Sequence, residues 1–101
     1  MFKNSIILYH RMVYNSPSHI KSILRLTYNS IYERSYNQKD FTKDKRILAD
    51  LQANDPDSSF ILEWIHRIAK ELRISDEPLL RKINPQKEHT IGELTDIIMA
   101  A

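Results

Sequence analysis

The scarcity of glycine is the feature that most limits what this chain can fold into. Among 101 residues there are one glycine, Gly92, and four prolines. A β-sandwich or barrel needs a tight reversal roughly every 8 to 12 residues, and such reversals depend on turn-forming residues. The sequence therefore favours helices. Its length fits one domain, since domains commonly hold about 100 to 150 residues.

The apolar content is high enough for a folded protein. Hydrophobic residues make up 42% of the chain, and Leu, Ile, Val and Phe together number 28. There is no cysteine, which excludes disulfides, Cys-based zinc sites and thiol nucleophiles, and makes a reducing cytoplasm the expected location. The apolar run at Ile6–Leu8 is interrupted by His10 and Arg11, so we expect no targeting segment and no membrane span.

The first strong helical pattern begins at Ser16-Pro17-Ser18. A hydroxyl side chain there can cap a helix, and proline is tolerated in the first turn. Residues suited to a buried face then recur at steps of three and four, which is typical of an amphipathic helix. These residues are Ile20, Ile23, Leu24, Thr27, Tyr28 and Ile31. We predict that this helix ends near Asn37.

Residues 37–56 form a connection that is longer than usual in compact domains, and such loops commonly carry structure or function of their own. Phe41, Ile47, Leu48 and Leu51 are apolar anchors in it. We therefore expect the loop to pack against the helices, with a short helical turn between Lys45 and Leu51.

The second half of the chain predicts three more helices. Turn-forming residues 54–59 precede a second apolar stripe, and Ser75-Asp76-Glu77-Pro78 precedes a short helix that stops at Asn84-Pro85. Thr90-Ile91-Gly92-Glu93 matches a capping box at the start of a last helix. The second stripe comprises Ile61, Leu62, Trp64, Ile65, Ile68, Ala69 and Leu72, and the last one comprises Ile91, Leu94, Ile97 and Ile98. The expected fold class is all-α.

This order of a long helix, a long loop, a second long helix, a short helix and a closing helix resembles the acyl carrier proteins. Asp57-Ser58-Ser59 is similar to the Asp-Ser-Leu motif that begins the family's second helix, with Ser59 in place of Leu. Ala49-Asp50-Leu51 resembles the end of the family's loop, and Thr90-Ile91-Gly92-Glu93 resembles the start of its last helix. The resemblance implies a four-helix bundle over residues 18–101, with residues 1–17 as an N-terminal extension.

The resemblance implies a carrier and not an enzyme, and no catalytic residues are expected. In the family, the motif serine is esterified with 4'-phosphopantetheine, whose thiol holds an acyl group as a thioester. The implied attachment site is Ser58 beside Asp57, with Ser59 as the second choice. A helix start suits a phosphodiester, because it presents backbone N–H groups and a partial positive charge. The alternative is that these residues only cap the helix.

Phosphopantetheinyl transferase and acyl-transferring enzymes of lipid or polyketide biosynthesis are the implied partners of a monomeric, cytoplasmic chain. We expect docking on the polar face of the second long helix, at Glu63, Arg67, Lys70 and Glu71, because residues 55–77 carry a local charge of −3. The alternative function is a non-modified, carrier-like helical adaptor that binds a protein partner through the same face.

The charge and histidine patterns support other functions less well than they support a carrier. The net charge is +2, but residues 1–50 carry +5 and residues 51–101 carry −3. A basic run near Tyr36 and Phe41 could touch RNA or anionic lipid, yet the acids Asp40 and Asp44 interrupt it, as is typical of a solvated loop. We expect no nucleic-acid partner. The histidines lack metal-ligand spacing, so no metal site is expected. The basic residues are Lys39, Lys43, Lys45 and Arg46, and the histidines are His10, His19, His66 and His89.

Overall fold

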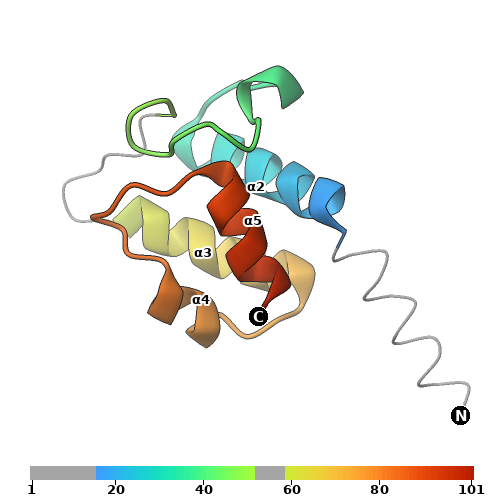
Figure 1. The fold of residues 1–101 in the computed structure, drawn as a ribbon, viewed down its shortest axis with the longest axis vertical. Helices are drawn as coiled ribbons and strands as arrows, with labels where there is room; N and C mark the ends of the chain where they lie inside the picture. Colours follow the sequence, from blue (N-terminus) through green and yellow to red (C-terminus); the bar gives the residue numbers. More distant parts are fainter. Residues whose placement is uncertain (1–15, 52–58) are drawn as a thin grey trace, which may run out of the picture.

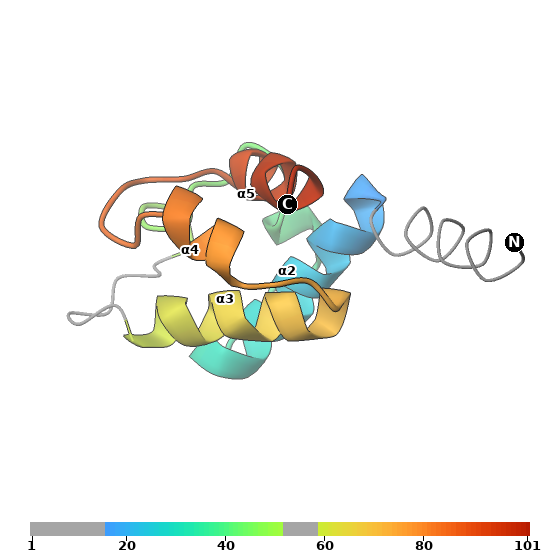
Figure 2. The same cartoon turned by 90° about the horizontal axis from the view of Figure 1, so that it is seen from below.

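A computed structural model describes residues 16–51 and 59–101, and these residues form a small helical bundle (Figure 1). The helices are α2 (Pro17–Tyr32), α3 (Ser59–Leu72), α4 (Glu77–Lys82) and α5 (Ile91–Met99), and a 3-10 helix, η1 (Gln38–Asp40), follows α2. Helix α2 packs against α3 and α5, and α4 lies against both α3 and α5 (Figure 2). The predicted all-α class is confirmed for this part of the chain.

Helix α2 begins where the sequence predicts and ends earlier. The Ser16 hydroxyl accepts a hydrogen bond from the His19 N–H at 3.3 Å, and Pro17 occupies the first turn. The predicted end near Asn37 is wrong, because Glu33 adopts a left-handed conformation (φ 53°) and its N–H donates to the Asn29 carbonyl. The Asn29 side chain then bonds both the N–H and the carbonyl of Tyr36, which holds the chain in the turn.

Helices α3 and α4 lie where the sequence predicts them, although the side chain of Asp76, the N-cap of α4, makes no capping hydrogen bond. Helix α3 ends at Leu72, after which Arg73 has a positive φ of 55° and the Ile74 N–H donates to the Ala69 carbonyl. Helix α4 starts with proline in its first turn and stops at Ile83, which is extended. The stop fits the following Asn84-Pro85, because the residue before proline avoids the helical region.

Helix α5 has the predicted cap at Thr90, whose hydroxyl accepts from the Glu93 N–H at 3.1 Å. The Glu93 carboxylate lies 3.3 Å from Nδ1 of His89. A reciprocal capping box forms instead at η1, where Asn37 and Asp40 each accept from the other's N–H.

The core lies between the four helices, and Trp64 is at its centre. Its Nε1 donates to the Thr27 hydroxyl at 2.9 Å, which satisfies the one polar group of a large buried ring. The predicted burial of Leu62 is wrong: its side chain is 41% exposed. Leu62 lies between the buried Ile61 and the exposed Glu63, at the margin of the apolar face of α3. The buried helical residues are Ile20, Leu24, Tyr28, Ile61, Trp64, Ile65, Ile68, Ala69, Leu72, Leu79, Ile91, Leu94 and Ile98. Ile23, Ile31 and Ile97 are partly buried against them.

The long loop packs against the bundle, as predicted. Phe41, Ile47 and Leu51 are buried, and Leu48 is partly buried. A turn closes over residues 46–51, because the N–H groups of Asp50 and Leu51 both donate to the Arg46 carbonyl. Side chains 47 and 51 therefore point to the core from one side of this turn. Across the described ranges, 16–51 and 59–101, no helix is long and apolar enough to cross a membrane.

Candidate functional site

The predicted attachment residues are placed only in part. Asp57 and Ser58 lie outside the described residues, whereas Ser59 is the first residue of α3 and is exposed. The next residue, Phe60, is 46% exposed, and its ring meets that of Tyr32 edge-on with the ring centres 5.5 Å apart. This contact anchors the first turn of α3 to the end of α2 and leaves the outer side of that turn open to solvent.

The chain is also fixed at Leu51, on the other side of the undescribed segment 52–58. The hydroxyl of Tyr28 donates to the Leu51 carbonyl at 2.5 Å, and the hydroxyl of Tyr36 donates to the same oxygen at 3.3 Å. Tyr28 is fully buried. The two ends of the segment that contains Ser58 are therefore each held by an aromatic side chain from α2.

The four predicted docking residues do gather on one surface. Glu63, Arg67, Lys70 and Glu71 are all exposed on α3 and line a shallow depression. Two neighbours orient the Arg67 side chain. One guanidinium nitrogen donates to the Ser30 hydroxyl at 3.1 Å, and the other lies 3.9 Å from the Glu63 carboxylate. The surface carries two cations and two anions and has no strong net charge.

The sequence reasoning missed a fifth member of this surface, His66. It lines the same depression, and its Nδ1 lies 2.5 Å from the Asp76 carboxylate in the turn before α4. The position of Asp76 depends on the left-handed Arg73 that reverses the chain after α3. A pattern of helical spacing does not reveal such a contact, because it joins two elements through a turn.

The interior offers little space for a ligand. Its apolar cavity measures about 10 Å³, which is about the volume of one water-sized probe. The lining residues are Leu24, Ile47, Ile61, Trp64, Ile65, Ile68, Ile83, Leu94 and Ile98. Among the described residues that line it, this cavity has no room for a group larger than a water molecule.

The two aromatic rings beside the basic residues of the loop pack toward the core, Phe41 fully and Tyr36 in part. Phe41 is 3% exposed, and the Tyr36 hydroxyl is engaged at Leu51. Asp50 accepts from the Arg46 N–H and from its guanidinium group, which lowers the pKa of Asp50 and raises that of Arg46. The Thr42 hydroxyl lowers the pKa of Asp44 in the same way. These local pairs are typical of a solvated loop.

The histidines are dispersed. His66 and His89 pair with Asp76 and Glu93 respectively, and His19 lies in the first turn of α2. In the portion of the chain with described positions, no cluster of three or more His, Asp or Glu side chains has the arrangement of a metal site. His10 falls outside that portion.

Comparison with known proteins returns no match of any kind. No family model matches the sequence, and neither a curated protein nor a solved structure is similar enough to report.

Proposed function

We propose that this protein is an acyl carrier, which holds an acyl group as a thioester on 4'-phosphopantetheine attached to Ser58. The observation that carries the proposal is the position of α3. Its first residue, Ser59, directly follows Asp57-Ser58 in the sequence, and its first turn is open to solvent. The element order around it supports an acyl-carrier-like bundle, with a long helix, a packed loop, a second long helix, a short helix and a closing helix.

The described residues around the site fit a phosphate-linked group. The start of α3 presents backbone N–H groups and the positive end of the helix dipole, both of which favour a phosphodiester. Ser59 and Glu63 are exposed, so an attached arm meets no wall of protein on this side. The phosphopantetheine, when bound, supplies a thiol on a flexible arm. The packed core leaves its cargo at the surface, unless the helices move apart.

The mixed-charge surface of α3 supports docking of a partner enzyme next to the arm. Charges that face one another across an interface steer association and select the partner. Because Glu63 and Glu71 flank Arg67 and Lys70, the matching surface has to carry charges of both signs. A partner with such a mixed-charge surface is a dedicated transferase, and a partner enzyme with a uniformly basic surface fits less well.

Intact mass after co-expression with a broad-specificity phosphopantetheinyl transferase tests the proposal. We expect one added prosthetic group on the wild-type chain, none on Ser58→Ala, and an unchanged addition on the matched variant Ser59→Ala. A wild-type mass that stays unmodified, while a control carrier in the same cells is modified, contradicts the carrier function. If Ser59→Ala loses the added group and Ser58→Ala keeps it, the attachment site is Ser59.

The second candidate is an unmodified helical adaptor, and the exposed apolar side chains of α3 favour it. Phe60 and Leu62 are 46% and 41% exposed beside the mixed-charge surface, and apolar residues within a charged rim are typical of protein interfaces. The adaptor predicts an unmodified chain that still binds its partner. The same mass measurement therefore separates the two functions.

A further inference from the structure

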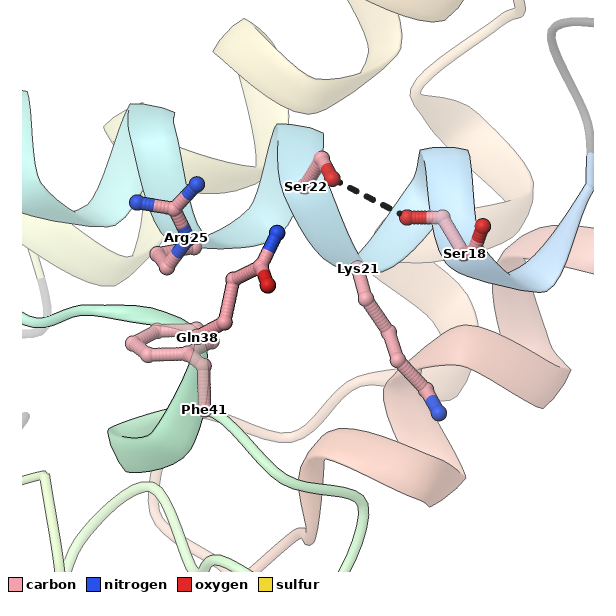
Figure 3. A pocket seen from close by; sticks show the side chains of 6 residues that line it. All are labelled: Ser18, Lys21, Ser22, Arg25, Gln38 and Phe41. Carbon is pink, nitrogen blue, oxygen red and sulfur yellow. Dashed lines mark hydrogen bonds between the residues drawn. The ribbon is translucent and has the colours of Figure 1, made fainter.

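A second surface site lies away from α3, in a cleft between α2 and η1. It measures about 230 Å³ and is open to solvent. Figure 3 shows Gln38 reaching from the η1 side toward α2, with Arg25 on one side of it and Lys21 on the other. The lining residues are Ser18, Lys21, Ser22, Arg25, Gln38 and Phe41.

The two charged side chains among the described residues that line the cleft are both positive. Helix α2 contains no Asp or Glu, and the cleft wall carries Lys21 and Arg25 four residues apart on one face. Like charges at this spacing destabilise a helix, and a bound anion removes that cost. Within the described residues, neither side chain forms an ion pair with a carboxylate. Both are partly buried, so their attraction for an anion is screened less than that of fully exposed charges.

The remaining lining groups supply hydrogen-bond donors on a fixed frame. The amide of Gln38 and the hydroxyls of Ser18 and Ser22 reach the cleft, and the Ser22 hydroxyl donates to the Ser18 carbonyl at 3.1 Å. None of the described lining residues carries a carboxylate. Phe41 is 3% exposed and packs against Tyr28 with ring centres 5.5 Å apart, so the η1 side of the cleft is held in place.

We propose that this cleft binds a phosphate monoester. Such a group carries about −1.5 to −2 charges near pH 7, which matches the two cations. The Arg25 guanidinium offers a planar pair of donors for two phosphate oxygens, Lys21 adds a point charge, and the Gln38 amide adds a neutral donor. The site does not depend on modification of Ser58, because it uses α2 and η1 and no residue of α3.

Titration of the full chain with phenyl phosphate, followed by two-dimensional NMR of the backbone amides, tests the site. We expect saturable shifts confined to residues 18–25 and 38–41. Arg25→Gln and Lys21→Gln are each expected to weaken binding by about fivefold or more, because charge-assisted hydrogen bonds are the stronger ones. Arg34→Gln is the matched control, since it removes the same charge from an exposed position just beyond α2, and it should change affinity by less than about twofold.

Two further arms identify the source of the phosphate. Inorganic phosphate tests the free anion, and vesicles containing phosphatidic acid present the same monoester as a lipid headgroup. The site is supported if binding in any of the three arms is saturable, is weakened by Arg25→Gln and is not weakened by Arg34→Gln. Absence of saturable shifts in all three arms overturns it. Equal weakening by Arg25→Gln and Arg34→Gln also overturns it, because the binding then follows net charge and not the cleft.

Discussion

The Leu51 carbonyl shows how much a single atom can organise in this chain. Two hydroxyls, from Tyr28 and Tyr36, converge on its oxygen from positions 23 and 15 residues away in the sequence. Leu51 is 1% exposed, so water is not an easy substitute for these donors. The same tyrosine rings lie 5.9 Å apart and frame the buried Phe41. The long loop and helix α2 are therefore joined at one acceptor, the Leu51 carbonyl oxygen.

This arrangement predicts that the two tyrosines are coupled in stability. Tyr28→Phe and Tyr36→Phe should each lower the free energy of unfolding by about 0.5 to 1.5 kcal/mol, the usual net contribution of one hydrogen bond. The double variant should lose more than the sum, because it leaves a buried carbonyl without a donor, which costs about 1 to 3 kcal/mol. Urea unfolding of all four proteins measures the coupling. Losses that add within about 0.5 kcal/mol argue against a shared acceptor.

At the scale of elements, the helices begin and end where nearby residues in the sequence predict. Their bounds differ from the prediction where a residue farther along the chain makes a contact. The Thr90 cap, the short helix after Ser75-Asp76 and the stripe of α3 apart from Leu62 were predicted, because each depends on residues within a few positions. The end of α2 was not, since it depends on Asn29 bonding the backbone of Tyr36. The contact between His66 and Asp76 also joins separate elements. Spacing along the sequence does not encode such pairs.

Helix α3 gives a direct test of this distinction, because Leu62 and Ile65 both belong to its predicted stripe and only Ile65 is buried, at 1% exposed. We expect Ile65→Ala to lower the free energy of unfolding by about 2 to 5 kcal/mol through a lost buried side chain. Leu62→Ala should cost less than about 1 kcal/mol, since its site is open to solvent.

Both substitutions place alanine in the same helix, so differences in helix propensity contribute little to the comparison. Chemical denaturation monitored by Trp64 fluorescence measures both values. Equal losses at the two positions would mean that Leu62 is covered in solution, by a partner or by a second copy of the chain.

For the candidate attachment site, the sequence supplied the motif and the structure supplies its surroundings. Asp57-Ser58-Ser59 and the polar face of α3 are contiguous or periodic, so both were visible in the sequence. The anchors at Leu51 and Phe60, by contrast, come from α2, and their contacts exist only once α2 and α3 have packed. The cleft at Lys21 and Arg25 was likewise hidden, because its second wall is η1.

At the scale of the whole molecule, the long loop and the segment before α5 join the two halves of the chain. The Ile47 N–H donates to the His89 carbonyl at 2.9 Å, and the Ile91 N–H donates to the Lys45 carbonyl at 2.9 Å. The Glu88 carboxylate accepts from the N–H groups of Leu48 and Ala49. These contacts hold the last helix where it packs against α2 and α4. The native position of the loop and that of α5 therefore depend on the same hydrogen bonds.

Gly92 allows the closest approach in this joint, and its replacement tests the whole arrangement. Glycine to alanine inside a helix ordinarily stabilises a protein by about 0.5 to 1 kcal/mol. Here the added Cβ would lie 3.1 Å from the Lys43 carbonyl oxygen, which itself accepts from the Gly92 N–H at 2.8 Å. If the Lys43 carbonyl moves away, its hydrogen bond with the Gly92 N–H weakens. The neighbouring hydrogen bond from the Ile91 N–H to the Lys45 carbonyl is strained as well. We therefore expect Gly92→Ala to lower the free energy of unfolding by about 1 kcal/mol, opposite in sign to the usual effect. Thermal and urea unfolding measure the sign, and a stabilised variant would show that the loop and α5 are not held together at this point.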